Sequence, residues 1–560
     1  NLQLVSPRKT SGVSSGGIIE REVLLPQRGR IMDANEEILT SNMQSSELIA
    51  DGYHLNDPKT ISWALAYSKA VHSPFWEKAA TDKEKEKLVS GFRSKILGQA
   101  ASKKDGSKEH NLAKILLEEP ENGPEGVDMA RKKLEELYEP EMVKEYVQAH
   151  LEYAAKVIAP FLPDMNVQDI INTVEKDGAI PKKRIVIAKN LSEEKAELLR
   201  QAIQNARVQG FRFETSSKRV YSVPECMVHI LGYIAQTKDS GPRPIALSGL
   251  EKQLDDQLLG HNGIREYRKD SRGRIIPSAD SRFKDAVDGL NVRLTVNMEY
   301  QTIVEEELDA AISFYTDQTH KPRGCIIVVE PKTGSILAMA SRPHYNLNTR
   351  EGLQEGAYHF AVQSLYEPGS TFKIVTFSAG LEEKVFKLDE YFNDPGYMVV
   401  DGARIKDWKA GGHGRETFLE VLQNSCNPGF MTIGLRLGKE RLFKYIKKYG
   451  FGKKTDIDLL GESSGIVFNP EKIGNVELAT SSFGQGNSVT AIQLVNAACA
   501  SVNGGILNKP TILKGIASNY QNGEYLIKQE TPIEVRRVIS EETSKTVASS
   551  LEHVASLGTA

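Results

Sequence analysis

A serine and a lysine placed three residues apart, Ser370 and Lys373, are the residues best suited to do chemistry. A Pro-Gly pair precedes the serine, and an apolar run over 374–381 follows the lysine and predicts a largely buried helix. Residues three apart on a helix share a face, so Ser370 Oγ and Lys373 Nζ can meet. A desolvated lysine can take the proton of a serine hydroxyl and make it a nucleophile. The pair therefore predicts serine acyl transfer.

The Ser-x-x-Lys spacing alone is not specific, because it begins at four serines in this chain: Ser6, Ser192, Ser281 and Ser370. Two glutamates follow Ser192, which is the pattern of a helix N-cap with an acidic first turn. Ser281 lies in a polar, charged stretch and Ser6 lies near the start of the chain. Only Ser370 combines a Pro-Gly turn with a continuous apolar helix behind it.

Ser425 and Asn427 form a second candidate element downstream of the first. Helical patterns over 417–422 and 431–435 flank them, so Ser425 is expected on a short loop where side chains can project into a cleft. Serine and asparagine also favour plain turns for local hydrogen-bonding reasons, which is the alternative. Their order after Ser370 favours a catalytic role. We interpret Cys426, between them, as a buried or spacer thiol and not as a nucleophile.

The order of these motifs resembles that of the penicillin-binding proteins, which combine Ser-x-x-Lys, Ser-x-Asn and Lys-Thr-Gly. The chain is most similar to the monofunctional (class B) members, and the likeness extends over about three quarters of its length. The motif around Ser425 resembles septal and sporulation-type members slightly more than elongation-type ones. Further segments that resemble the family are 28–33, 219–221, 231–233, 248–251, 338–343, 346–348, 451–452, 461–462 and 483–486, with Thr490 and Gln493.

The resemblance implies a peptidoglycan D,D-transpeptidase. Lys373 would accept the proton of Ser370, which would attack the carbonyl of the penultimate D-alanine of a stem peptide and release the terminal D-alanine. Ser425 would relay a proton to the leaving amine, and Asn427 would orient the substrate amide and support Lys373. β-Lactams would acylate the same serine. No metal or organic cofactor is implied.

The resemblance also implies partners and a location. The ligands would be stem peptides ending in D-Ala-D-Ala and β-lactams. The protein partners would be a SEDS-type membrane glycosyltransferase and other cell-wall assembly proteins. The chain would act at the extracytoplasmic face of the bacterial cytoplasmic membrane, in the periplasm, with a single N-terminal anchor expected outside the 560 residues.

The third motif of the family, Lys-Thr-Gly, is expected to follow the Gly-Thr-Ala at 558–560, where the chain ends. We interpret the chain as truncated before that motif, and natural absence is the alternative. Another Lys-Thr-Gly occupies 332–334, but apolar runs over 324–329 and 335–338 flank it. Strands joined by such a segment predict a hairpin turn.

Composition excludes several other classes of protein. The formal net charge of −3 gives no reason to expect nucleic acid as a partner. The sequence has no zinc-type cysteine pair, P-loop or dinucleotide fingerprint, and no apolar run approaches the roughly 18 residues of a membrane span. The four cysteines, Cys226, Cys325, Cys426 and Cys499, are too scattered to predict a disulfide framework.

The predicted fold is a mixed α/β, multidomain one. Residues 1–56 are expected to form strands of an N-terminal pedestal, residues 57–163 a charged, helix-rich insertion, and residues 164–288 the second part of the pedestal. Residues 289–560 are expected to form the transpeptidase domain, with a largely antiparallel sheet flanked by helices and an all-helical lobe.

Four other functions are alternatives: two would use the same serine and lysine for hydrolysis, and two would bind without completing a reaction. A D,D-carboxypeptidase or a β-lactamase would pass the acyl group from Ser370 to water. The large N-terminal part argues against both, because a compact hydrolase does not need it. A β-lactam sensor or a catalytically silent scaffold would bind partners through the pedestal and the insertion, and the missing third motif favours silence.

Overall fold

The computed structural model describes residues 18–56, 58–102, 140–206, 208–235, 244–269, 275–276, 282–317, 319–520 and 523–558. The chain forms two compact units. One contains Asn1–Ser41 and Arg219–Ala560, and the other contains Asn42–Lys218. Strand β3 (Ile38–Asp51) begins in the first unit and ends in the second. The predicted mixed α/β, multidomain fold is confirmed.

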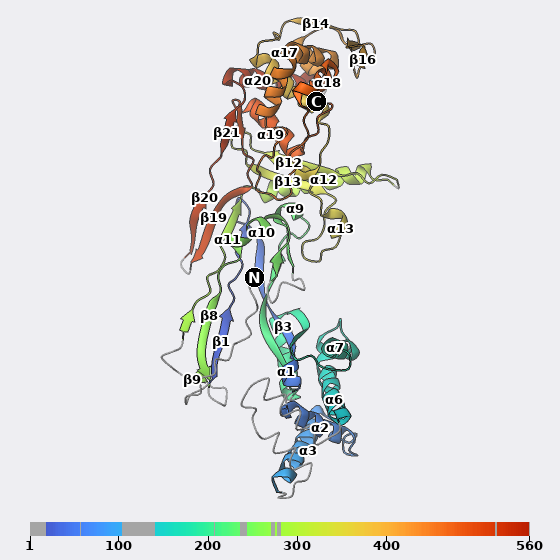
Figure 1. Cartoon of the computed structure of the whole chain (residues 1–560), viewed down its shortest axis with the longest axis vertical. Helices are drawn as coiled ribbons and strands as arrows, with labels where there is room; N and C mark the ends of the chain where they lie inside the picture. The colour runs from blue at the N-terminus through green and yellow to red at the C-terminus, as the bar shows by residue number, and fades with distance from the viewer. Residues whose placement is uncertain are drawn as a thin grey trace. The chain divides into compact units, whose positions relative to one another are not determined.

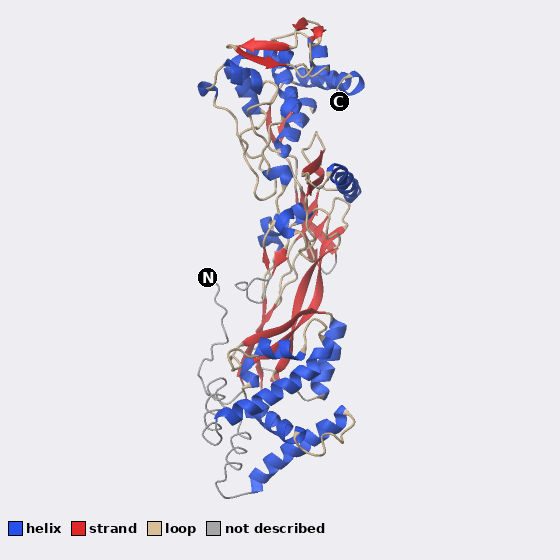
Figure 2. Cartoon of the chain, turned by 90° about the vertical axis from the view of Figure 1, so that its right-hand side faces the viewer, coloured by secondary structure: helices blue, strands red, loops and turns tan. Residues whose placement is uncertain are grey.

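The smaller unit, Asn42–Lys218, packs helices against the second half of β3. β4 (Arg184–Leu191) pairs antiparallel with β3 from Ser46↔Leu191 to Asp51↔Arg184. Helix α6 (Pro140–Ile158) supplies apolar side chains that share a core with β4 and with α8 (Glu193–Asn205). The other helices of this unit, blue in Figure 2, are α1 (Gly52–Leu55), α2 (Pro58–Val71), α3 (Asp82–Ser102) and α7 (Val167–Val174). The described parts of the predicted insertion at 57–163 contain α2, α3 and α6.

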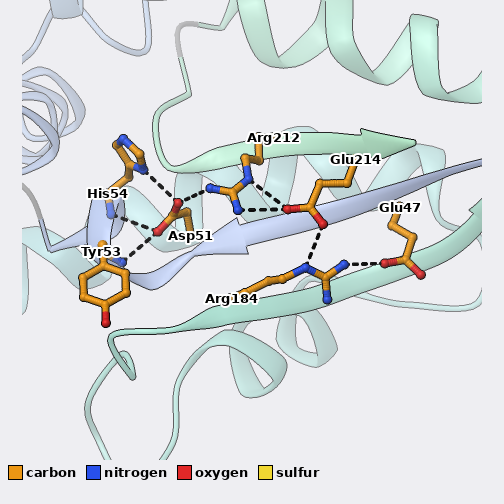
Figure 3. A network of polar contacts seen from close by, with 7 residues as sticks. All are labelled: Glu47, Asp51, Tyr53, His54, Arg184, Arg212 and Glu214. Carbon is orange, nitrogen blue, oxygen red and sulfur yellow. Dashed lines mark hydrogen bonds and ion pairs between the residues drawn. The ribbon is translucent and has the colours of Figure 1, made fainter. Parts of the chain in front are cut away.

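An ionic network covers part of this sheet (Figure 3). Arg184 binds Glu47 at 2.6 Å and Glu214 at 2.8 Å, while Arg212 binds Glu214 at 2.9 Å and also pairs with Asp51. Asp51 is in addition the N-cap of α1, because its carboxylate accepts the first backbone N–H groups of that helix. Arg212 and Glu214 lie in a third strand, β5 (Phe211–Tyr221), so the network ties β3, β4 and β5 to the start of α1.

The larger unit begins with long strands. β1 (Ile18–Leu24) pairs antiparallel with β8 (Gly263–Lys269), which also pairs with β9 (Ile275–Ile276) and β10 (Arg282–Lys284). β2 (Ile31–Met32) lies parallel to β11 (Asn291–Leu294), and β19 (Leu513–Tyr520) and β20 (Gly523–Gln529) extend that sheet. Strand β5 (Phe211–Tyr221), most of which belongs to the smaller unit, also pairs with β3. Short elements complete this part: α9 (Val228–Leu231), β6 (Ile234–Ala235), β7 (Ile245–Ala246), α10 (Gly249–Gln253) and α11 (Asp255–Leu258).

An antiparallel hairpin of β12 (Gly324–Val329) and β13 (Ile336–Arg342) supports the next part of the unit. Its turn contains residues 332–334, so the predicted hairpin turn at this Lys-Thr-Gly is confirmed. Helix α12 (Met298–Tyr315) packs along β13 (Figure 1). Val304 and Leu308 of the helix share a core with Ala338 and Ala340 of the strand.

An all-helical lobe follows, coloured orange to red in Figure 1. Large aromatic side chains fill its core, and Phe372, Phe377, Phe418 and Phe430 are each fully buried. The lobe is built from α15 (Lys373–Glu382), α16 (Phe418–Gln423), α17 (Asn427–Lys448), α18 (Asn475–Ser481), α19 (Ala491–Val502) and α20 (Glu541–Leu557).

Two short antiparallel pairs pack on α17. β14 (Tyr391–Asp394) pairs with β17 (Gly414–Thr417), and β15 (Tyr397–Val400) pairs with β16 (Ala403–Lys406). The remaining short elements are α13 (Leu353–Gly356), α14 (Phe360–Gln363), β18 (Ile506–Asn508) and β21 (Glu534–Arg537). In the part of the chain that is described, no helix has both the length and the apolar character needed to cross a membrane.

Candidate active site

Ser370 and Lys373 lie at the start of the helix that the apolar run predicts. Ser370 belongs to a 3-10 turn, Gly369–Phe372, and Lys373 is the first residue of α15. The serine is exposed, whereas only 3% of Lys373 is accessible. An accessible hydroxyl thus lies close in sequence to a lysine that has lost most of its water.

Glycines fix the backbone in front of this serine. Gly369 has φ +58°, and its N–H donates a 3.0 Å hydrogen bond to the carbonyl of Gly484. Gly484 has φ +86°, and a Cβ there would lie 2.1 Å from the carbonyl oxygen of Gly369. Only glycine permits this approach together with that φ. The 483–486 segment, which was noted for its resemblance to the family, therefore sets the position of the turn that carries Ser370.

Ser425 occupies the predicted short loop, between α16 and α17. The second helix begins at Asn427, four residues earlier than the apolar pattern indicates, because Cys426 acts as its N-cap and a proline follows at the second helical position. Ser425 itself has φ +54°, a left-handed conformation that costs a non-glycine residue energy. The strained residue sits where the site needs a hydroxyl.

Lys373 joins the two motifs. Its Nζ donates to the Ser425 carbonyl oxygen at 2.6 Å, contacts Ser425 Oγ at 2.9 Å and donates to Asn427 Oδ1 at 2.7 Å. These contacts bring the start of α15 together with Ser425 and with the start of α17. Among the described residues, no hydrogen bond links Ser370 Oγ to Lys373 Nζ.

Burial lowers the pKa of Lys373 from its usual 10.5 to about 8, against the opposing charges of Asp407 and Cys426. An amine with this pKa is partly neutral near physiological pH. A neutral amine keeps two N–H groups, which match the two carbonyl-type acceptors, and its lone pair remains for a hydroxyl. Lys373 and Ser425 can then exchange a proton.

Sequence reasoning missed the groups behind the loop. Asp407 Oδ1 accepts the backbone N–H of Asn427 at 2.8 Å, and Glu416 accepts the side-chain amide of Asn424 at 3.0 Å. The indole of Trp408 donates to the Asn424 carbonyl at 3.0 Å. These residues follow no motif, and only the short strand pairs bring them to the loop.

The other sequence interpretations have clear outcomes. Ser192 is the N-cap of α8, as predicted, and its hydroxyl accepts the N–H of Lys195. Cys426 is fully buried, and the chain's four cysteines are unpaired. Ser6, Ser281 and residues 559–560 lie outside the described residues, as do 103–139 of the predicted insertion.

Two family models cover most of the chain. Residues 324–560 match the penicillin-binding protein transpeptidase domain, and residues 23–294 match the penicillin-binding protein dimerisation domain. The first range holds all four site residues. The fold and this match define a protein with a penicillin-binding transpeptidase domain. With both domains in this order, the chain belongs to the class B penicillin-binding proteins.

Curated relatives agree with this family. The chain is 42% identical to Stage V sporulation protein D of Bacillus subtilis over 71% of its own length and 59% of that protein. It is 29% identical to the peptidoglycan D,D-transpeptidase FtsI of Escherichia coli (68% and 59% covered) and 27% identical to MrdA of Acinetobacter baumannii (59% and 52%). The first match agrees with the preference for septal and sporulation-type members. The chain thus spans between half and three fifths of these relatives.

Solved structures share the fold. Penicillin-binding protein 2X of Streptococcus thermophilus superposes with a TM-score of 0.63 at 22% identity, covering 95% of this chain and 66% of that one. A complex of PBP2 with MreC from Helicobacter pylori gives a TM-score of 0.65 at 18% identity, covering 96% and 83%. At these identities the likeness concerns the fold alone.

Proposed function

We propose that this chain is the catalytic part of a peptidoglycan D,D-transpeptidase that forms an acyl-enzyme on Ser370. The observation that carries the proposal is the buried Lys373, which holds Ser425 and Asn427 through three contacts of 2.6–2.9 Å and begins the helix directly behind Ser370. A desolvated lysine beside a serine is a means of activating that serine as a nucleophile.

The acylation step follows from these groups. Lys373 Nζ takes the proton of Ser370 Oγ, which attacks the carbonyl carbon of the penultimate D-alanine. The C–N bond to the terminal D-alanine breaks, and Ser425 Oγ passes a proton to the leaving amine and regains one from Lys373. Asn427 holds Lys373 and orients the substrate amide. A hydrogen bond that delivers a proton in this way typically contributes about 10²–10⁴-fold in rate.

Transfer to a second strand completes the cross-link. The amine of another stem peptide attacks the acyl carbonyl, an amide bond forms, and Ser370 Oγ leaves and recovers its proton. The backbone N–H of Ser370 would stabilise the oxyanion, and such a preorganised donor supplies about 3 kcal/mol in comparable acyl-transfer sites. A β-lactam would acylate Ser370 through its strained amide in place of the D-Ala-D-Ala bond.

Acylation by a fluorescent penicillin tests the assignment. The full-length protein should give a stable adduct that intact mass and peptide mapping place on Ser370. Ser370→Ala should give none. The matched control is Ser192→Ala, because Ser192 has the same Ser-x-x-Lys spacing but caps α8. Absence of any adduct in the full-length protein would reject the transpeptidase and favour the silent scaffold.

Turnover separates the hydrolytic alternatives. A transpeptidase should hold the penicilloyl group for many minutes and should join two stem peptides when a second amine is supplied. Rapid release of the hydrolysed drug would identify a β-lactamase. Release of D-alanine without cross-linked product would identify a D,D-carboxypeptidase.

We also propose partners and a location for the whole protein. The expected partners are cell-wall assembly proteins, among them a SEDS-type membrane glycosyltransferase. The match of residues 23–294 to a dimerisation domain supports a role of this part in protein contacts. The PBP2 of Helicobacter pylori, whose fold this chain shares, was solved with MreC. The catalytic domain would act on the extracytoplasmic side of the membrane. Co-purification of the full-length protein with a co-expressed glycosyltransferase, and its loss without residues 42–218, would test the contact.

A further inference from the structure

Four side chains with metal-binding atoms gather behind the loop that carries Ser425. Asp394 ends β14, Asp407 follows β16, His413 precedes β17, and Cys426 caps α17. The ligand atoms of Asp394, Asp407 and Cys426 all lie within 4.8 Å of one another. His413 Nε2 lies 3.2 Å from Asp407 Oδ2.

The cluster is buried. Asp394 is 1% exposed and Cys426 is fully buried, while the side chains of Asp407 and His413 are 0% and 5% exposed. Carboxylates are rarely placed so deep unless they are paired or coordinate a metal. Two of them beside a thiol and an imidazole need an explanation.

Two polar atoms of the cluster lack a hydrogen bond. Asp407 Oδ2 and His413 Nε2 are both buried, face each other, and have no hydrogen-bond partner among the described residues. An unsatisfied buried polar group costs about 1–3 kcal/mol, and more when it is charged. The missing partner of both atoms is a group that accepts lone pairs, which is what a metal cation does.

The other lone pairs of the cluster are already engaged by backbone N–H groups. Asp394 accepts from Gly396 at 2.7 Å and from His413 at 2.8 Å, and Asp407 Oδ1 accepts from Asn427 at 2.8 Å. Cys426 Sγ accepts from Gly429 at 3.4 Å. Such outer hydrogen bonds orient metal ligands and fix which lone pair points inward.

We propose that Asp394, Asp407, His413 and Cys426 bind one Zn²⁺ ion. A set of one sulfur, one nitrogen and two oxygens suits zinc, whereas magnesium and calcium take oxygen ligands only. Four protein ligands fill a tetrahedral shell, so the ion would be structural and not a site for substrate. On binding, the Zn–Sγ bond forms and the thiol proton leaves to solvent.

The ion would lie directly behind the loop of the candidate active site and would stabilise that loop. Cys426 separates Ser425 from Asn427, and Asp407 holds the Asn427 N–H, so the ion would clamp the strained loop that presents both side chains to Lys373. The four ligands would be positioning residues that act through Ser425 and Asn427. Metal binding itself does not depend on the proposed acyl transfer.

A metal-free cluster is the competing explanation. The Glu416 carboxylate lies against the Cys426 thiol, and burial together with this carboxylate raises the pKa of the thiol. Without a metal, the thiol would stay protonated and donate to Glu416. The two explanations differ in metal content and in the state of the sulfur.

The first experiment measures the metal directly. The full-length protein, purified without chelator, should contain about one zinc per molecule by plasma mass spectrometry. Replacement by Co²⁺ should give the intense visible bands of a tetrahedral site and a thiolate-to-cobalt charge-transfer band. His413→Gln and Cys426→Ser should each weaken zinc affinity at least tenfold, and Cys426→Ser should abolish the charge-transfer band. Cys499→Ser is the matched control, since Cys499 is also buried but lies in α19.

The outcomes separate cleanly. Zinc-free protein that binds neither Zn²⁺ nor Co²⁺ would overturn the site, and so would a cobalt spectrum unchanged in both ligand variants. Should Cys426→Ser fail to fold, the affinity of His413→Gln decides. Because metal content is read without any β-lactam, failure of the metal site and failure of the proposed acyl transfer are distinguishable.

A second experiment tests the positioning role. Removing the metal with a chelator should reduce penicillin acylation of Ser370 at least tenfold and increase hydrogen exchange over 424–428. Added Zn²⁺ should restore both. In the His413→Gln variant, chelator should change neither. Loss of metal with full retention of acylation and exchange protection would reject the positioning role while leaving the site.

Discussion

The backbone N–H of Asn427 donates a 2.8 Å hydrogen bond to Asp407, while the Asn427 side chain accepts one of 2.7 Å from Lys373. One residue therefore transmits the position of a buried carboxylate to the lysine that the mechanism uses as a base. These hydrogen bonds support the candidate active site from behind the loop and help to set the position of the lysine Nζ.

The first prediction concerns pH. The pKa of Lys373 is lowered to about 8, so the fraction of neutral amine increases as the pH rises through that value. The rate of penicillin acylation should rise with pH and level off above the pKa of Lys373, because the neutral amine is the base. Stopped-flow acylation across this range measures the midpoint.

Two variants check that the midpoint belongs to this residue. Lys373→Met should slow acylation by about 10²–10⁴-fold and remove the midpoint. Lys332→Met is the control, because Lys332 lies in the β12–β13 turn. A midpoint near 8 that persists in Lys373→Met would assign the titration to another group.

The second prediction separates the hydroxyl of Ser425 from its backbone strain. Ser425 has φ +54°, which glycine adopts without penalty and alanine does not. Ser425→Gly and Ser425→Ala both lose the Oγ that contacts Lys373, so both should acylate more slowly, by about 10²-fold or more. Thermal unfolding should show the glycine variant to be the more stable.

The comparison of rates decides between the two roles. Equal slowing in both variants, despite unequal stability, would show that the hydroxyl is what acylation requires. A glycine variant that acylates at the wild-type rate would show that Ser425 serves only to shape the loop, and it would remove the proton relay from the mechanism.

The sequence predicts the motif positions well because local patterns encode them. The apolar run behind Ser370, the loop at Ser425 and the hairpin turn at 332–334 all depend on periodicity and turn residues that a short window contains. Asp407, Trp408 and His413 lie in irregular segments between short strands, and only their tertiary pairing brings them to the loop. No spacing rule reveals such a cluster, and its single cysteine hides it from a search for cysteine pairs.

Tertiary contacts also explain why some segments that resemble the family, but are far from Ser370 in the sequence, contain the residues that they do. Position 484 requires glycine because the backbone of Gly369 lies too close for a Cβ atom. The sequence around Gly484 does not predict this contact. The apolar pattern over 431–435 begins after the true start of α17 at Asn427, because the first turn of this helix contains proline and glycine. Local sequence patterns therefore predict the helices, the turns and the candidate nucleophile Ser370. The contacts that hold these parts in place are long-range and are seen only in the structure.

The third prediction tests that support at Gly484. A Cβ there would lie 2.1 Å from the carbonyl oxygen of Gly369, so Gly484→Ala must displace the turn before Ser370. Gly504 is a matched control, because its φ of +95° is similar to the +86° of Gly484 but a Cβ there meets nothing within 4 Å. Both variants should lose about 1–3 kcal/mol through backbone strain.

Acylation distinguishes them. Gly504→Ala should keep nearly the wild-type rate with fluorescent penicillin, whereas Gly484→Ala should lose most of it at temperatures where both remain folded. Similar rates in the two variants would mean that the close approach at Gly369 has no bearing on the nucleophile.

The fourth prediction concerns the ionic network of the smaller unit. Burial would raise the pKa of Asp51, but the hydrogen bond and charge of His54, the charge of Arg212 and the Tyr53 N–H outweigh it and lower the pKa to about 2. A carboxylate with a lowered pKa stabilises the fold above its unfolded value of 3.8 and loses that effect as pH falls toward 2. Local stability near α1 should therefore decrease between these pH values.

Hydrogen exchange in the intact chain measures this loss. The amides of Tyr53 and His54, which Asp51 caps, should lose protection as the pH falls through that range, after correction for intrinsic exchange rates. Asp51→Asn should remove the pH dependence. Lowered protection only below pH 2 would show that another group controls this helix end.

The last prediction explains why three segments that resemble the family meet. Glu251 is fully buried and accepts hydrogen bonds from Arg28 Nε at 2.5 Å and Arg219 Nε at 2.7 Å. Glu251→Gln would remove the buried carboxylate that both guanidinium groups share, and breaking a buried ion pair on one side costs about 3–5 kcal/mol. Asp255→Asn is the control, because Asp255 also binds Arg28, at 2.6 Å, but is 38% exposed, and such pairs contribute about 1 kcal/mol or less.

Urea unfolding followed by tryptophan fluorescence should therefore show a large loss of stability for Glu251→Gln and a small one for Asp255→Asn. Equal losses would mean that burial of Glu251 is not what makes the three segments interdependent.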